Sequence, residues 1–444
     1  KKLYLDRYNQ DVDPGPNSPV TKDVTNTIKD GVFMFNYMGH GNEFQLTSLN
    51  ELAIDQDVIR NLSNRHKLPL FVTATCEFGK YDNPLRESGA ELLLSHDNGG
   101  AIALLTTTRA VYAHTNEPVN VALHENLFTK TNGRYPTLGD VIKNTKNESL
   151  SGPINRNFAL LGDPMLRLNY PEYDITLNQF GQLDTLSALE KVTISGEIKN
   201  GSTVVSNFNG TATITIWDIP QTKITKGDES DPYTFTEQTN TLYRGEFSVV
   251  KGKYNAEVIL PKNISYKYQQ GKLSIYASDP TNFIDAKGST KNFVLGGTAD
   301  NVSADDASPE VNLYLNEPDF KSGSVVGPSS LFIAELTDES GINISSNGFS
   351  QGITLQLNDE EPIAVNEFYT AELDNFSKGY ITFPLQNLEP GKYTAKLKVS
   401  DTHNNFTESV VEFNVSNKPI LKIYNALNYP NPVSSNRLTT FSFE

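Results

Sequence analysis

The chain has 444 residues, with 37 Lys and Arg against 53 Asp and Glu, and a net charge of −16. This length exceeds one ordinary hydrophobic core, so about two to four domains are expected. The acidic balance argues against nonspecific nucleic-acid binding, which needs a basic face. With 37% hydrophobic and 10% aromatic residues, the chain is not disordered as a whole.

Cys76 is the only cysteine, so no intramolecular disulfide is expected. A single cysteine with histidines elsewhere fits a candidate nucleophile, although an inert buried thiol is the commoner state of such a residue. No signal peptide is recognisable, and no apolar run reaches the roughly 18 residues of a membrane span. Both termini lie within strand-like patterns, so we expect a fragment or processed form of a longer protein.

Residues 1–170 alternate apolar runs with helical stretches. Strands are expected at 31–37, 68–74 and 101–105, because short continuous apolar runs suit parallel strands that are covered on both faces. Helices are expected in three places: at 58–62 after Asp55, from Asn83-Pro84 through Leu94, and from Asn116 and Pro118 onward. This alternation predicts a parallel α/β sheet.

The pattern changes to strands and turns after Tyr170. Residues 171–300 are expected to form an antiparallel β-sandwich, and residues 309–416 a second one after a polar linker at 296–309. Strands are predicted at 192–198, 210–217, 330–336 and 393–399. A further, incomplete β domain is expected at 418–444. The predicted fold class is therefore multidomain, with an α/β part followed by all-β immunoglobulin-like sandwiches.

Two chemically reactive residues follow the first two predicted strands. His40 lies in Met38-Gly39-His40-Gly41-Asn42, and Cys76 lies in Thr75-Cys76-Glu77. Sites in open α/β sheets form at the carboxyl ends of strands, and neighbouring strands lie roughly 5 Å apart. If the two strands are neighbours, the thiol and the imidazole lie within reach of each other. The order of the strands along the chain does not by itself make them neighbours, so their adjacency is an assumption of this prediction.

Such a pair suits nucleophilic catalysis. An imidazole activates a nearby thiol or holds it as an ion pair, and then protonates the leaving amine. The backbone N–H groups of Gly41 and Cys76 are the candidate oxyanion hole. The alternative is that Cys76 is a core thiol and His40 an ordinary turn residue. From the residues alone the two interpretations are about equally supported.

No catalytic metal site or cofactor is expected, because the cysteine and histidine spacings match no known metal motif. A structural calcium ion remains the one alternative. Acidic loop residues offer ligands for it, although solvated loop charge is the commoner explanation. These residues are Asp228, Glu229 and Asp231, or Asp305 and Asp306.

The stretches around His40 and Cys76 resemble the histidine and cysteine motifs of the gingipain family of cysteine peptidases (peptidase family C25). They are Asn36-Tyr37-Met38-Gly39-His40-Gly41-Asn42-Glu43 and Phe71-Val72-Thr73-Ala74-Thr75-Cys76-Glu77-Phe78-Gly79. Residues 88–103 and 161–168 resemble later family segments in the same order. The resemblance implies a caspase-like fold over 1–170 with a Cys76–His40 dyad. It also implies that an N-terminal half of the catalytic region, with any residue that orients the imidazole, lies upstream.

Residues 426–433 and 439–443 resemble the opening of a type IX secretion C-terminal domain. Together with the long β-rich tail, they are similar to the gingipain-related sortases of that system in Bacteroidota. This resemblance implies a peptidase on the outer surface of a Gram-negative outer membrane. It implies three kinds of partner: secreted cargo with C-terminal sorting domains, surface lipopolysaccharide, and other outer-membrane subunits of the system.

Two other functions stay open. The chain is also compatible with a secreted gingipain-like endopeptidase that carries its own sorting domain. It is compatible as well with a non-enzymatic protein whose sandwiches bind a partner and whose α/β part is a degenerate scaffold.

Overall fold

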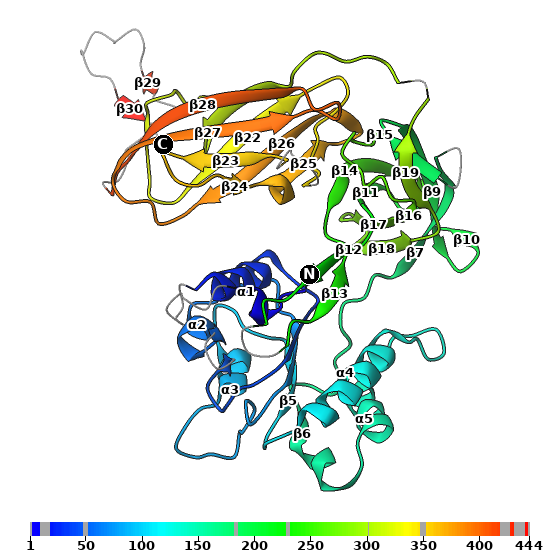
Figure 1. Ribbon diagram of the computed structural model, residues 1–444. Coiled ribbons are helices and arrows are strands. Elements are labelled where there is room, and N and C mark those ends of the chain that lie inside the picture. Colours follow the sequence, from blue (N-terminus) through cyan, green and yellow to red (C-terminus); the bar gives the residue numbers. More distant parts are fainter. Residues whose placement is uncertain are drawn as a thin grey trace. The chain divides into compact units, whose positions relative to one another are not determined.

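The computed structural model describes residues 2–8, 18–47, 52–181, 185–227, 231–300, 302–346, 352–417, 427–429 and 440–442 (Figure 1). The chain divides into two compact units. The first comprises Lys1–Tyr170 and Thr222–Glu237, and the second comprises Pro171–Gln221 and Gln238–Glu444. None of the described helices is long and apolar enough to cross a membrane.

The first unit is built on a four-stranded sheet in the order β1-β4-β5-β6. Its strands are β1 (Met34–Met38), β4 (Leu70–Ala74), β5 (Ala103–Thr107) and β6 (Phe158–Leu161). β1, β4 and β5 run parallel, and β6 is antiparallel to β5. Every residue of β4 and β5 is buried, which explains why these strands are continuous apolar runs.

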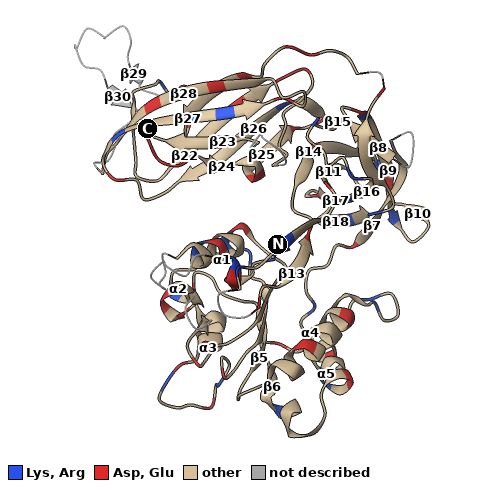
Figure 2. Ribbon diagram, viewed as in Figure 1, with Lys and Arg blue, Asp and Glu red and all other residues tan. Residues whose placement is uncertain are grey.

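Helices cover both faces of this sheet (Figure 1). α1 (Pro19–Asp30), α2 (Gln56–Arg60) and α3 (Gly89–Ser95) pack against Phe71 and Leu104. α4 (Ala113–Phe128) and α5 (Leu138–Ser149) pack against the alternate residues Leu70, Val72, Ala103 and Leu105. Successive strand residues point to opposite faces, so one apolar run supplies both cores. The four strands of this sheet carry no charged residue, and Figure 2 shows charges on the helices that surround it.

Two of the predicted helix starts are wrong. Residues 83–88 are not helical, and α3 begins after Ser88, whose side chain and that of Glu91 make a reciprocal capping box. That box satisfies two backbone N–H groups, which the Asn83-Pro84 start would not do. α4 begins at Ala113, so Pro118 lies inside the helix instead of at its first turn. The start after Asp55 is correct, because Asp55 accepts from the N–H of Val58.

The first unit also includes short hairpins. β2 (Leu46–Thr47) pairs with β3 (Leu52–Ile54) just after His40. β12 (Gln221–Ile224) and β13 (Thr234–Glu237) pair with each other and contact the N-terminal segment. There the rings of Tyr4 and Phe235 lie 4.1 Å apart, and Arg7 forms an ion pair with Glu237 at 3.2 Å.

The second unit is all β. Its first part contains β7 (Tyr173–Phe180), β8 (Thr185–Ala188), β9 (Lys191–Asn200), β10 (Thr203–Val204), β11 (Gly210–Trp217), β14 (Thr241–Val250), β15 (Lys253–Ile259), β16 (Gln269–Gln270), β17 (Lys272–Asp279), β18 (Ile284–Thr290) and β19 (Val294–Thr298). Its second part contains β20 (Glu310–Leu315), β21 (Val325–Val326), β22 (Ser330–Thr337), β23 (Thr354–Leu357), β24 (Ile363–Ala364), β25 (Tyr369–Glu372), β26 (Asn375–Leu385), β27 (Gly391–Ser400) and β28 (Phe406–Val415). In the first part the main sheet closes on itself, because β15 pairs with both β14 and β9, and β16, β19 and β8 form a separate small sheet. In the second part, strands of the main sheet and a five-stranded sheet share one apolar core. The predicted class of an α/β part followed by all-β domains is confirmed, but the first all-β part is a closed ring of strands and not a two-sheet sandwich.

The two all-β parts share one 12-stranded sheet. β14 of the first part pairs in parallel with β25 of the second through Gly245 and Ala371, and one continuous apolar core runs beneath both. Most pairs are antiparallel as predicted, but four pairs are parallel: β7 with β18, β8 with β19, β14 with β25, and β21 with β28. Of the predicted domain at 418–444, the described residues show one short hairpin of β29 (Leu427–Tyr429) and β30 (Thr440–Ser442); the rest lies outside the described residues.

Candidate active site

His40 and Cys76 occupy equivalent positions beyond two paired strands. Met38, the last residue of β1, is the direct partner of Ala74, the last residue of β4, in a parallel pair. His40 and Cys76 each follow two residues later. The Gly39 N–H continues the contact by donating to the Ala74 carbonyl at 3.5 Å. The strand adjacency on which the predicted dyad depends is therefore present, and both side chains start from the same edge of the sheet.

The backbone around His40 is held by a short antiparallel turn. The His40 carbonyl accepts from the Thr47 N–H at 3.1 Å and from the Tyr37 hydroxyl at 2.7 Å. Tyr37 is 8% exposed and also donates to the Thr47 carbonyl at 3.1 Å. His40 itself is exposed. The backbone is thus fixed while the imidazole faces open space.

Gly41 packs closely against Thr75, the residue before Cys76. A Cβ atom at Gly41 would lie 2.6 Å from Oγ1 of Thr75 and 2.8 Å from the Gln45 carbonyl oxygen. Gly41 also forms a β-bridge with Leu46, in which the hydrogen bonds come from the flanking N–H groups of Asn42 and Thr47. In this type of antiparallel pair the residue in the middle does not donate to the ladder. The Gly41 N–H is therefore directed away from Leu46.

Cys76 is half-buried, and its thiol approaches the third strand-end loop. Sγ lies 3.6 Å from the Val111 carbonyl oxygen, to which the S–H donates. The backbone before Cys76 is anchored on both sides: Thr107 Oγ1 donates to the Thr75 carbonyl, and Asn116 Nδ2 of α4 donates to the Ala74 carbonyl at 3.0 Å. From sequence, Asn116 is only a helix start, because nothing local to it indicates this long-range contact.

Glu77, directly after Cys76, has a φ of 56°. This left-handed conformation is uncommon for a residue with a side chain, and such strain persists only where surrounding contacts hold it. The carboxylate of Glu77 lies 3.3 Å from the Lys80 ammonium. The chain therefore turns sharply at Cys76, which leaves the thiol at a bend.

Lys80 links the Cys76 loop to the His40 loop. Its ammonium lies 2.6 Å from a carboxylate oxygen of Glu43, and Asn83 Nδ2 donates to the other oxygen at 3.2 Å. The hydrogen bond and charge of Lys80 lower the pKa of Glu43, and the hydrogen bond from Glu43 raises the pKa of Lys80. The backbone carbonyl of Glu43 also accepts from the Gly89 N–H at 2.7 Å.

A second ion pair ties the Cys76 loop to the loop after β5. The Arg109 guanidinium bonds to both carboxylate oxygens of Asp82, at 2.5 Å and 3.1 Å. The hydrogen bond from Arg109 lowers the pKa of Asp82. The loops after β1, β4 and β5 are thus connected in the order of the strands.

A cavity of about 530 Å³ lies along β1 and reaches His40. Its lining is mainly apolar and aromatic, and includes Tyr4, Phe35, Met38 and Tyr233. Mainly apolar concave sites with a few polar groups are the usual form of ligand pockets in proteins.

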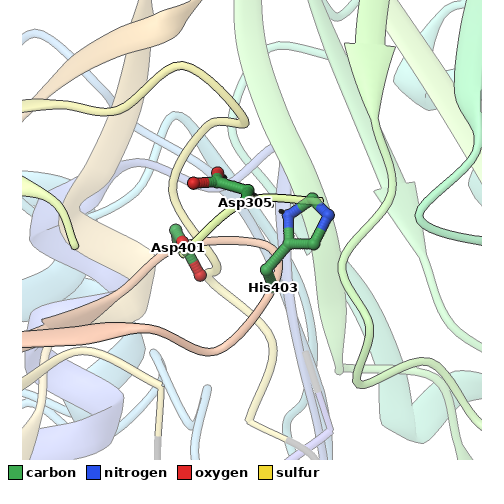
Figure 3. A group of neighbouring side chains, drawn as sticks. All are labelled: Asp305, Asp401 and His403. Atoms are coloured by element: carbon green, nitrogen blue, oxygen red, sulfur yellow. Dashed lines mark ion pairs between the residues drawn. The ribbon is translucent and has the colours of Figure 1, made fainter. Parts of the chain in front are cut away.

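One group of potential metal ligands lies in the second unit, far along the chain from the dyad. Asp305, Asp401 and His403 place one ligand atom each within 4.8 Å of the others (Figure 3). The side chain of Asp305 is 3% exposed and that of His403 is 14% exposed. Calcium takes about six to eight oxygen ligands, so these three side chains alone would not complete a calcium site. Of the residues named from sequence, Asp305 belongs to this group and Asp306 and Asp231 do not, while Asp228 and Glu229 lie outside the described residues.

Comparison with known proteins bears on the first unit. Residues 1–169 match the sequence model of peptidase family C25. No curated protein matches the chain. Among solved structures, the chain is similar to dimeric latent PorU from Porphyromonas gingivalis, with 27% identity and a TM-score of 0.36. The match covers 76% of this chain and 33% of PorU, so the chain spans about a third of that protein's length.

A second similar structure is the Arg-specific cysteine proteinase gingipain R, with 18% identity, a TM-score of 0.30, and coverage of 61% of this chain and 55% of that one. RgpB from Porphyromonas gingivalis, in a complex of its pro- and mature domains, matches at 17% identity with a TM-score of 0.31, over 60% of this chain and 57% of that one. The match to a cysteine-peptidase family model over residues 1–169 includes Cys76, which is the only cysteine of the chain.

Proposed function

We propose that this protein is a cysteine peptidase in which Cys76 is the nucleophile and His40 the general acid and base. The observation that carries the proposal is the parallel pairing of Met38 with Ala74, which starts both side chains from one edge of the sheet. A thiol and an imidazole at such an edge form the arrangement that nucleophilic catalysis requires. Cys76 is half-buried and His40 is exposed, so both residues are at least partly accessible from solvent.

The acylation step follows from these roles. The imidazole of His40 takes the proton of the Cys76 thiol, Sγ attacks the carbonyl carbon of the scissile peptide bond, and the carbonyl oxygen becomes an oxyanion in the tetrahedral intermediate. The C–N bond then breaks, and the imidazolium of His40 gives its proton to the departing amine. The acyl fragment of the substrate, which lies N-terminal to the cleaved bond, stays on Cys76 as a thioester.

The oxyanion hole is proposed to consist of the N–H groups of Gly41 and Cys76. The Gly41 N–H is not used by its β-bridge with Leu46, so it is available to a ligand. Two backbone donors aimed at a developing negative charge stabilise a tetrahedral intermediate. Gly41 also approaches Thr75 closely, which brings this donor next to the Cys76 backbone.

We further propose that the substrates are secreted proteins with type IX C-terminal sorting domains, and that the enzyme acts on the outer surface of a Gram-negative outer membrane. An amine on surface lipopolysaccharide would attack the thioester, so that an amide forms and the Cys76 thiol is released. Attack by water would give a free carboxylate instead. Residues 426–433 and 439–443 resemble the opening of a type IX secretion C-terminal domain, and together with the long β-rich tail they are similar to the gingipain-related sortases. This resemblance supports the more specific function. Other outer-membrane subunits of the secretion system are its proposed partners.

The test is a cargo-processing experiment in the native bacterium with wild-type protein, Cys76→Ala and Cys76→Ser. We expect both variants to accumulate secreted cargo that retains its sorting domain. The matched control is Ser95→Ala on α3, which should process cargo normally. Normal cargo processing combined with lower general proteolysis would favour a secreted endopeptidase instead. Wild-type behaviour in both respects would favour a non-enzymatic binding protein.

A further inference from the structure

We propose that Glu43 and Lys80 are positioning residues, which hold the His40 loop in register with the Cys76 loop. This inference rests on the proposed function, because it names the device that keeps the proposed dyad aligned. Neither side chain is assigned contact with substrate.

Glu43 fastens the His40 loop to the segment after Cys76 through three separate contacts. Its carboxylate accepts from Lys80 at 2.6 Å and from Asn83 at 3.2 Å. Its backbone carbonyl accepts from the Gly89 N–H at 2.7 Å. Glu43 comes three residues after His40, so a shift of Glu43 moves the histidine turn directly.

Lys80 carries the connection to Cys76. Its ammonium contacts Glu43 at 2.6 Å and Glu77 at 3.3 Å, so one cation joins two carboxylates. Glu77 directly follows Cys76 and is held at a φ of 56°. Neighbouring contacts must stabilise that conformation, and the Lys80 contact is one of them.

Phe44, the next residue, makes a further contact with the segment that follows Cys76. Arg86 places its guanidinium 5.6 Å from the centre of the Phe44 ring, and its charge also lowers the pKa of Glu43. The His40 loop is therefore fastened at two successive residues to the segment that follows Cys76. This concentration of contacts lies at the strand ends that carry the dyad, which is where misalignment would affect chemistry.

The pair is suited to alignment rather than to global stability. The side chains of Glu43 and Lys80 are 16% and 28% exposed, and partly exposed ion pairs contribute little to folding stability. A misplacement of about 1 Å in an active site, by contrast, can lower a rate about 100-fold. Loss of Lys80 should therefore change the reactivity of Cys76 much more than it changes the melting temperature.

The experiment measures alkylation of the full chain by iodoacetamide at pH 6 and pH 9. Cys76 is the only cysteine, so the signal has one source. An isolated thiol reacts slowly at pH 6, because the thiolate is the nucleophile. The variants are Lys80→Met, Glu43→Gln, Lys80→Arg and His40→Ala. The matched control is Arg60→Met, which removes the exposed Arg60–Asp57 ion pair on α2.

We expect His40→Ala to lower the ratio of the pH 6 rate to the pH 9 rate at least tenfold. Lys80→Met and Glu43→Gln should lower the same ratio about three- to tenfold, and Lys80→Arg should restore it. All variants, including the control, should melt within a few degrees of wild type. A lowered ratio in His40→Ala together with wild-type ratios in Lys80→Met and Glu43→Gln would overturn the positioning role alone. A wild-type ratio in His40→Ala would overturn the dyad itself, and the positioning role with it.

Discussion

Gly41 and Thr75 lie so close that a Cβ atom on Gly41 would be 2.6 Å from the Thr75 hydroxyl oxygen. Thr75 is 1% exposed and precedes Cys76, and Gly41 follows His40. The two loops of the proposed dyad therefore touch through backbone and a buried hydroxyl. Their spacing depends on the absence of a side chain at one position.

Gly41→Ala should lower the activity strongly. The added methyl group must push the His40 loop away from Thr75, and displacement of about 1 Å costs up to about 100-fold in rate. Cleavage of a peptide substrate, followed as kcat/KM, measures the loss. Gly391→Ala is the control, because a Cβ atom there meets no atom within 4 Å. Equal activity in both variants would show that the close approach has no functional weight.

Tyr37→Phe removes one hydroxyl that donates to the carbonyls of His40 and Thr47. The turn that carries His40 loses two hydrogen bonds from a buried side chain, while the imidazole itself is unchanged. We expect kcat to fall about tenfold with KM little altered, since a loss confined to the transition state lowers kcat and kcat/KM together. Steady-state kinetics with one peptide tests this. A rise in KM alone would instead place Tyr37 in substrate binding.

Asn116→Ala should destabilise the first unit by about 1.5 kcal/mol, the upper end of the net contribution of one hydrogen bond, because the Ala74 carbonyl keeps the N–H of Gly39 as a donor. The lost hydrogen bond is the one from Asn116 Nδ2 to the Ala74 carbonyl, at the end of β4. Urea denaturation measures the change. Asn126→Ala, a less buried position on the same helix, is the control and should cost less than about 1 kcal/mol. Similar losses in both variants would contradict a special role for Asn116.

The stability of the second unit should depend on pH through Asp338. Burial, with the charges of Asp401 and Asp305 nearby, raises the pKa of Asp338 to about 7. The folded state then holds a proton that the unfolded chain releases above about pH 4. Stability from this group is present below pH 4, falls as the pH rises towards 7, and is constant above that.

Asp338→Asn should remove much of this pH dependence, on the order of 2 kcal/mol between pH 5 and pH 8. Burial also raises the pKa of Asp401, so a residual dependence of the same sign should remain. His403 lies beside Asp305 in the same group. Urea denaturation of the variant and of wild type at pH 5 and pH 8 tests this. An unchanged pH slope in Asp338→Asn would contradict the assignment.

The parts of the fold that produce a local pattern of apolar and polar residues in the sequence could be predicted from it. Buried parallel strands are continuous apolar runs, so β1, β4 and β5 could be placed, and with them the two residues that follow β1 and β4. The helix predicted from Asn83 failed because Asn-Pro is a common start signal, while the Ser88–Glu91 capping box lies five residues further on. Local signals compete, and only packing decides between them.

Long-range pairing could not be predicted. The parallel contact between Gly245 and Ala371 joins the two all-β parts into one sheet, yet the partners are more than 100 residues apart and neither strand's pattern indicates it. The contact of Lys80 with Glu43 could not be predicted either, since nothing in the sequence around them distinguishes them from ordinary surface charges. From sequence Asp305 is only a loop charge, although the fold buries it beside Asp401 and His403.

The most direct test of the account is the intact mass of the full chain, quenched in acid during turnover of a peptide that spans a cargo cleavage site. We predict a species that is heavier by the acyl group of the fragment N-terminal to the cleaved bond. This group should be located on Cys76, and neutral hydroxylamine should remove it, as expected for a thioester. The adduct should be absent in Cys76→Ala, which should also leave the peptide uncut. Cleavage of the peptide by Cys76→Ala, or an adduct on any other residue, would contradict the assignment of Cys76 as the nucleophile.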